Sequence, residues 1–148
     1  SRGLGDVYKR QVEMLTAAGY VVEETMILPD EAKALKAQLI RMADGRQVNL
    51  VLTTGGTGFS PRDITPEATC AVADRNAPGI AEAMRYHSLS ITPRGMLSRG
   101  VSVLRGKTLI VNLPGSPKAV QENLEYILPS LEHGVRIAAG LDGECARK

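Results

Sequence analysis

The chain has 148 residues, 43% of them hydrophobic, and its 18 basic and 16 acidic side chains leave a net charge of +2, which suits one folded domain over residues 1–148. Because the basic residues are dispersed, and the chain has four Tyr, one Phe and no Trp, the composition argues against a nucleic-acid-binding surface. No apolar run reaches the roughly 20 residues of a membrane span, no signal peptide opens the chain, and Cys70 and Cys145 are isolated, so we expect a cytoplasmic protein without a membrane partner.

The first half of the chain alternates helical and strand patterns. Apolar residues at helical spacing before Gly19 predict a helix that ends at this glycine. The stretch Val21–Leu28 is β-rich, and Pro29-Asp30 then begins a second predicted helix that ends at Asp44-Gly45. The continuous apolar run Val48–Thr53 predicts a strand that is buried on both faces, as in a parallel sheet.

The second half continues this alternation. Thr65-Pro66 has the chemistry of a helix N-cap followed by proline at the first helical position. The predicted elements are helices over 66–75, 80–88 and 119–137, the last interrupted near Pro129, and strands over 101–104 and 108–112 that form a short hairpin. Alternating β and α segments predict an α/β fold with a doubly wound, mostly parallel sheet flanked by helices.

A glycine-rich loop follows the strand Val48–Thr53. Gly55, Gly56 and Gly58 carry no Cβ, so the backbone can take positive φ and turn its N–H groups toward an anion. The loop ends at Asp63, whose carboxylate would face phosphates only with a cation such as Mg²⁺ between them. The Walker A and Rossmann glycine patterns are both incomplete here, and a steric strand-to-helix turn is the alternative interpretation of the glycines.

A second loop, Leu113–Lys118, also follows a strand and also contains glycine, proline and serine. In a doubly wound sheet both loops would fall at the carboxyl ends of the strands, where ligands bind. Local sequence leaves other roles open: this second loop as a plain turn, Asp30 as a helix N-cap and Asp63 as a turn residue. The isolated His87 and His133 are interpreted as packing or surface residues rather than ligands.

Three segments together resemble one protein family. They are Thr53-Thr-Gly-Gly-Thr-Gly-Phe-Ser-Pro-Arg-Asp-Ile-Thr-Pro-Glu-Ala-Thr69, Ser88–Arg99 and Arg105–Lys118. They closely resemble the molybdopterin adenylyltransferases of the MogA type, which include the G domain of gephyrin, and the match continues in one register from about Gly19 to Ile137. The resemblance implies a Mg²⁺-dependent transfer of AMP from ATP to molybdopterin with release of pyrophosphate, in molybdenum cofactor biosynthesis. It also implies a homotrimer and a downstream molybdate-insertion enzyme as partner.

Carried over position by position, the resemblance implies that Asp30 and Asp63 are the catalytic carboxylates. A phosphate nucleophile is already ionised, so the main work is charge neutralisation and alignment rather than base catalysis. We therefore assign Asp63 to magnesium positioning and Asp30 to a shared metal or substrate-orienting role. The substrate-binding positions implied are Thr54, Gly55, Gly56, Thr57, Gly58, Ser98, Asn112, Pro114, Gly115 and Ser116.

The opening residues depart from the family pattern. The family begins with an apolar strand ending in Ser-Asp and then an Asp-x-Ser-Gly turn, whereas residues 1–11 read Ser-Arg-Gly-Leu-Gly-Asp-Val-Tyr-Lys-Arg-Gln, so the first family strand is absent from this sequence. One alternative function is a molybdopterin-binding relative without adenylylation, of the molybdate-insertion type, which the Pro-Arg-Asp match disfavours. Another is a non-catalytic trimeric scaffold, for which the sequence shows no linker.

Overall fold

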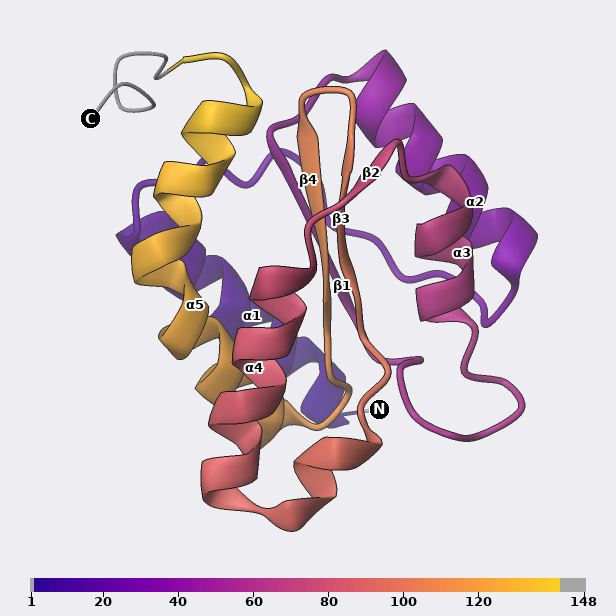
Figure 1. The fold of residues 1–148 in the computed structure, drawn as a ribbon, viewed down its shortest axis with the longest axis vertical. Helices are drawn as coiled ribbons and strands as arrows, with labels where there is room; N and C mark the ends of the chain where they lie inside the picture. The colour runs from indigo at the N-terminus through magenta and orange to yellow at the C-terminus, as the bar shows by residue number, and fades with distance from the viewer. Residues whose placement is uncertain (1, 142–148) are drawn as a thin grey trace.

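The computed structural model describes residues 2–141 and shows a sheet with helices on both faces (Figure 1). Cys145 lies outside the described residues. The elements in chain order are α1 (Arg2–Ala17), α2 (Ala32–Ile40), η1 (Arg41–Gly45), β1 (Leu50–Thr54), α3 (Thr65–Val72), β2 (Arg75–Asn76), α4 (Pro78–Ile91), η2 (Pro93–Leu97), β3 (Ser102–Arg105), β4 (Thr108–Leu113) and α5 (Pro117–Ala138). The predicted α/β fold with flanking helices is confirmed.

The sheet has four strands in the order β1-β4-β3-β2. β1 and β4 are parallel, whereas β4 with β3 and β3 with β2 are antiparallel, so the sheet is mixed rather than mostly parallel. The predicted hairpin is confirmed as β3 and β4, with Gly106 in its turn at a φ of 55°. β3 and β4 are antiparallel because a short turn can join only antiparallel neighbours.

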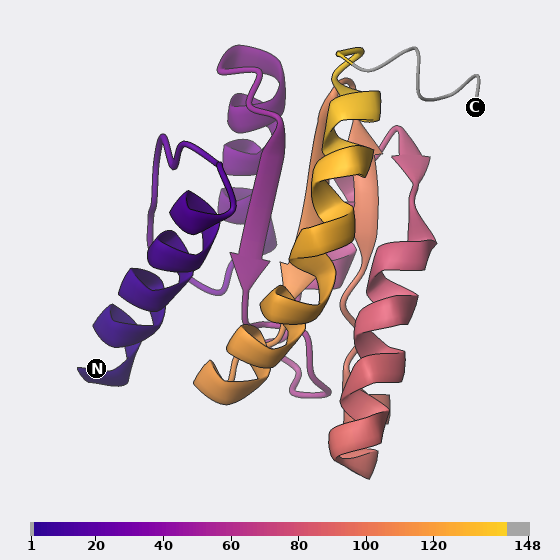
Figure 2. The same ribbon diagram turned by 90° about the vertical axis from the view of Figure 1, so that its left-hand side faces the viewer.

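β4 lies at the centre of the sheet and separates two hydrophobic cores. Its side chains alternate between them, with Leu109, Val111 and Leu113 in one core and Ile110 in the other. The first core is covered by α1, α4 and α5, which lie side by side in Figure 2, and the second is covered by α2 and α3. All six residues of β4 are buried, so this strand fixes the position of the loop that follows it.

The helix predictions are largely confirmed, with shifted ends. α1 ends two residues before Gly19, whose φ of 97° is the left-handed cap that the glycine predicted. α3 ends earlier than predicted because Asp74 leaves the helix and donates its backbone N–H to the Leu104 carbonyl at 2.8 Å. The predicted interruption of the last helix is wrong, since α5 continues through the exposed Pro129. Buried side chains on either side of this proline, including Leu124 and Leu131, hold both halves of the helix against the sheet.

The β-rich stretch Val21–Leu28 is not a strand, contrary to prediction. Within the described part of the chain its backbone forms no ladder with a neighbour, and Val21 and Ile27 are 85% and 70% exposed. Among the described residues β1 lies at the sheet edge and pairs only with β4. A cavity of about 670 Å³ lies beside β1, and its lining includes Val21–Leu28 together with parts of α1 and α2. Residues with high β-propensity form a strand only beside another strand to pair with. Here the cavity lies between Val21–Leu28 and β1.

The position of β1 at the edge also changes its burial. Of its five residues only Val51 is buried, so the predicted burial on both faces is wrong. The strand itself is confirmed, and its parallel pairing places Thr54 opposite Leu113 at the ends of β1 and β4. The glycine-rich loop and the loop Leu113–Lys118 therefore begin at neighbouring points, at the carboxyl ends of β1 and β4.

Candidate active site

The two loops predicted from the sequence meet beyond the carboxyl ends of β1 and β4. The backbone N–H of Gly55 donates to the Leu113 carbonyl at 3.1 Å, which ties the first loop to the end of β4. A Cβ placed on Gly115 would lie 3.3 Å from the Cα of Gly55, closer than real Cβ contacts normally come. The absence of a side chain at Gly115 therefore allows the loops to touch, and their predicted proximity is confirmed.

The glycines of the first loop serve different purposes. Gly55 and Gly56 have φ values of 85° and 69°, so the predicted positive φ is confirmed at both. A Cβ on Gly56 would also overlap the hydroxyl of Thr65 at the start of α3. Gly58 does not adopt positive φ, contrary to prediction; a Cβ there would lie 2.9 Å from Oδ2 of Asp63, so the carboxylate would have to shift.

Asp63 closes the loop with one of its two carboxylate oxygens. Its Oδ2 accepts the backbone N–H of Ser60 at 2.9 Å, and its own N–H donates to the Ser60 carbonyl at 2.9 Å. This is the turn role that local sequence left open. Oδ1 forms no hydrogen bond with the described residues, so one oxygen holds the turn and the other remains available to a ligand.

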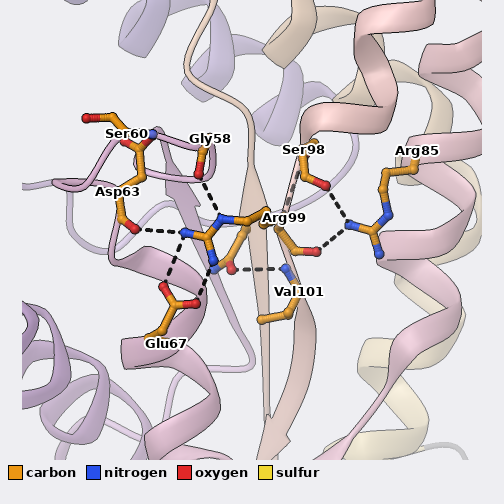
Figure 3. A network of polar contacts seen from close by, with 10 residues as sticks. Gly58, Ser60, Asp63, Glu67, Arg85, Ser98, Arg99 and Val101 are labelled. Atoms are coloured by element: carbon orange, nitrogen blue, oxygen red, sulfur yellow. Dashed lines mark hydrogen bonds and ion pairs between the residues drawn. The ribbon is translucent and has the colours of Figure 1, made fainter.

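Arg99 spans the same loop from outside (Figure 3). Its guanidinium donates to the carbonyls of Gly58 and Asp63, both at 2.8 Å, and forms a two-pronged ion pair with Glu67 in the first turn of α3 at 2.6 and 3.3 Å. The hydrogen bonds from Arg99 lower the pKa of the Glu67 carboxyl, and the same bonds raise the pKa of Arg99. Nearby, Arg85 donates to the Gly100 carbonyl at 2.7 Å.

Neither arginine was predicted as a site residue. Arg99 and Glu67 both lie within the segments that carry the family resemblance, yet they are 32 positions apart, and nothing in the local sequence connects them. The ion pair exists only because the fold brings α3 beside the segment that leads into β3. Only a comparison of covarying positions among relatives would have been able to indicate it before the structure.

Asp30 does not cap the helix that follows it. The N-cap of α2 is Glu31, and Asp30 is exposed and forms neither a hydrogen bond nor an ion pair with the described residues. It borders the same cavity as Thr54, Gly55 and Gly56. Asp63, Thr57 and Gly58 do not line this cavity, and Thr57 is only 5% exposed. The structure thus places Asp30 and the first half of the glycine loop on the lining of one cavity.

The second loop leads into the longest helix. Ser116 is the N-cap of the 22-residue α5, and its Oγ accepts the Ala119 N–H at 3.1 Å. Gly115 and Ser116 are exposed and Pro114 is half-buried, so the first turn of α5 faces solvent beside Gly55. A helix N-terminus with free N–H groups favours a phosphate.

Two of the predicted substrate contacts, Asn112 and Ser98, form hydrogen bonds within the protein. Asn112 is only 1% exposed; its amide donates to the hydroxyls of Thr53 and Thr69 at 2.9 and 3.1 Å and accepts the Val101 N–H at 3.1 Å. Because each polar atom of the side chain already has a protein partner, we assign Asn112 a structural role, and its contact with substrate stays a prediction. Ser98 is half-buried, and its Oγ accepts the Gly100 N–H at 3.4 Å.

We expect Asn112→Ala to lower the free energy of unfolding by about 1–3 kcal/mol, because it leaves a buried N–H and two hydroxyls without partners. Urea denaturation measures this change. The exposed Asn49→Ala is the control and should stay within about 0.5 kcal/mol of the parent. Unchanged stability together with weakened ligand binding would restore the substrate-contact interpretation of Asn112.

The acidic residues suit a metal that is bound mainly through substrate. Among the described residues no group of three or more His, Cys, Asp or Glu gathers in one place. Mg²⁺ commonly binds through one or two carboxylates plus substrate phosphates, and the free Oδ1 of Asp63 and the exposed carboxylate of Asp30 fit that donor set. As predicted, His87 packs, with its ring stacked on Tyr126 at 4.2 Å, and His133 is exposed.

Comparisons with known proteins agree on one family. A family model described as a probable molybdopterin binding domain matches residues 10–133. The molybdopterin adenylyltransferase of Haemophilus influenzae is 52% identical over 104 residues, covering 70% of this chain and 53% of that enzyme. The chain thus spans about half the length of this relative. The crystal structure of the molybdopterin biosynthesis enzyme MoaB from Thermus thermophilus superposes with a TM-score of 0.85 at 46% identity, covering 90% of this chain and 84% of that one. The Mog protein from Mycobacterium ulcerans gives a TM-score of 0.82 at 38% identity, covering 90% and 87%.

Proposed function

This chain belongs to the family of probable molybdopterin-binding domains, and on that premise we propose that it is a molybdopterin adenylyltransferase. It would use ATP to adenylylate molybdopterin, with release of pyrophosphate, in molybdenum cofactor biosynthesis. The observation that carries the proposal is the contact of two phosphate-type loops, at Gly55 and Gly115, beside the exposed carboxylate of Asp30.

The reaction joins two anions, so the chain has to hold phosphates together and in line. An oxygen of the molybdopterin phosphate attacks the α-phosphorus of ATP, the bond from that phosphorus to the α,β-bridging oxygen breaks, and pyrophosphate leaves with that oxygen. The Gly55 N–H is taken by the Leu113 carbonyl, so the N–H of Gly56 would bind one phosphate. The N-terminus of α5 would bind the other, with the proton of the Ser116 hydroxyl free to donate because its oxygen serves as the cap.

Asp63 and Asp30 would hold Mg²⁺ in this proposal. The bound ion supplies neutralisation of the phosphate charges. The residues themselves orient the substrates: Asp63 through a loop fixed by Ser60, and Asp30 from the lining of the cavity, where no cap bond restrains its carboxylate within the described chain. Electrostatic organisation of this kind is commonly the largest contribution to phosphoryl transfer.

We also propose that the protein forms a homotrimer and passes its product to a molybdate-insertion enzyme. Large exposed apolar side chains support a self-association surface along α4 and η2. They are Tyr86, Leu89, Ile91, Met96 and Leu97, with exposures of 76, 45, 46, 63 and 48%. None of the helices in residues 2–141 is long and apolar enough to span a membrane.

Mass spectrometry of the products tests the activity directly. The protein is incubated with ATP, Mg²⁺ and molybdopterin, and we expect adenylylated molybdopterin and pyrophosphate in equal amounts. Tight molybdopterin binding with no adenylylated product would instead favour the molybdate-insertion type of relative. Binding of neither substrate would favour a scaffold.

Ser116→Ala should weaken molybdopterin binding by roughly 10-fold or more, the effect of losing one hydrogen bond to a charged group, and should weaken ATP binding less. Isothermal calorimetry measures both affinities. Ser116→Thr is the matched control, because threonine keeps the hydroxyl and also caps helices. If ATP binding suffers more than molybdopterin binding, the loop at Gly115 has been assigned to the wrong substrate.

A further inference from the structure

Arg99 contacts the Gly58–Asp63 loop at both of its ends. Its Nε donates to the Gly58 carbonyl and its Nη2 to the Asp63 carbonyl, each at 2.8 Å, and its backbone N–H donates to the Thr57 carbonyl at 2.8 Å (Figure 3). One residue from the segment before β3 therefore joins the beginning and the end of the loop that carries Asp63. Between these two points residues 59–62 are all exposed, and the other hydrogen bonds of the span lie within the turn itself, between Ser60 and Asp63 and between Ser60 and Arg62.

The guanidinium is itself held in one orientation. Glu67 accepts from both Nη1 and Nη2, which is the paired geometry that a planar guanidinium and a carboxylate adopt. Four of the five guanidinium N–H donors are then engaged by protein acceptors, so little donor capacity remains for a phosphate. The geometry makes Arg99 a support for the loop rather than a ligand of the substrate.

The contact with Asp63 is made through the backbone. Arg99 binds the carbonyl of Asp63, whereas the side chain of Asp63 is held by the Ser60 N–H. Fixing the backbone at both Gly58 and Asp63 leaves the carboxylate few directions in which to point. A loop of six residues without this support would lose conformational entropy when the substrate binds.

We propose that Arg99 is a positioning residue, which sets the direction of the Asp63 carboxylate by clamping the loop at Gly58 and Asp63, with Glu67 orienting the guanidinium. This inference rests on the proposed function for its catalytic consequence. The clamp itself is a statement about the loop and can be measured separately. Lysine is a poor substitute, because an ammonium group cannot reach two carbonyls and a carboxylate in fixed planar directions.

Arg105 offers a matched control elsewhere in the protein. It also forms a two-pronged ion pair, with Asp44 at 3.1 and 2.7 Å, and also donates to a backbone carbonyl, that of Val72 at 2.8 Å. It lies at the hairpin end of β3, opposite the end of β4 from which the second loop leaves. Loss of this arginine should affect stability about as much as loss of Arg99, without reaching the loop.

The experiment compares Arg99→Gln, Arg99→Lys, Glu67→Gln and Arg105→Gln. Hydrogen exchange of the Ser60 and Asp63 amides should accelerate roughly 10-fold in Arg99→Gln, the equivalent of one hydrogen bond to a charged group, and should not change in Arg105→Gln. In the full assay kcat should fall by roughly 10- to 100-fold in Arg99→Gln with KM for molybdopterin little changed, because misplacement of a catalytic group acts on the reacting geometry. Arg99→Lys and Glu67→Gln should lie between Arg99→Gln and the parent.

The two measurements separate failure of the clamp from failure of the proposed function. Unchanged exchange at both amides in Arg99→Gln overturns the clamp, whether or not the parent protein is active. Faster exchange with an unchanged kcat overturns the positioning role, and an equal loss of kcat in Arg105→Gln does so as well. A parent protein that forms no adenylylated product overturns the proposed function, and the exchange data then still decide the clamp.

Discussion

Replacing Asp63 with asparagine is expected to lower turnover by roughly 100-fold or more, the scale of losing one essential electrostatic group. The loop should keep its shape, because an asparagine amide oxygen can still accept the Ser60 N–H that Oδ2 accepts now. Molybdopterin binding should therefore remain close to that of the parent. The loss would come from the negative charge alone, and steady-state kinetics with calorimetry on the same samples measure both quantities.

Asp74→Asn is the matched control for this substitution. Asp74 is also a turn carboxylate that accepts a backbone N–H, that of Gly106 at 2.6 Å, and it lies beside the hairpin turn, away from the two loops. Its replacement should leave turnover unchanged. Product formation near the parent rate in Asp63→Asn would remove Asp63 from the mechanism, and an equal loss in Asp74→Asn would show that the effect is structural.

Asp30→Asn should retain its melting temperature and lose activity, by roughly 100-fold if its charge helps to hold the metal or the substrate. The reason is that Asp30 is exposed and contacts none of the described residues through hydrogen bonds or ion pairs, so folding does not depend on its charge. Thermal unfolding and the product assay are run on the same preparation. The neighbouring Glu31→Gln is the control, because Glu31 occupies the N-cap position of α2 and should not alter turnover.

The opposite pattern would identify Asp30 as a helix cap. In that case Asp30→Asn would remain active, since asparagine caps as well as aspartate, and Asp30→Ala would melt earlier by the equivalent of about 1 kcal/mol. The structure argues against this outcome, because the cap position is one residue later than local sequence indicated.

Sequence was most informative where local chemistry determines structure. The φ of Gly19, the turn at Gly106 and the loop glycines Gly55 and Gly56 all follow from the absence of a side chain. The proximity of the two loops followed from the parallel pairing of β1 and β4, whose carboxyl ends lie side by side.

Sequence was least informative where contacts between distant segments decide. Val21–Leu28 has the composition of a strand, yet it lacks a neighbouring strand in the described structure. The burial of Asn112 depends on Thr53 and Thr69, and the role of Arg99 depends on Glu67. These partners are 32 to 59 positions apart along the chain, and composition carries no information about them.

The open edge of β1 has a consequence for the behaviour of concentrated solutions. An edge strand is a template on which another chain can build a ladder, and proteins usually protect such edges with lysine, proline or a bulge. Leu50–Thr54 contains neither of those residues and is only partly covered. A strand from a neighbouring molecule that docked there would enter the cavity bordered by Asp30 and Gly55. The docked strand and the substrate would then compete for the same cavity. Saturating ligand would therefore oppose aggregation.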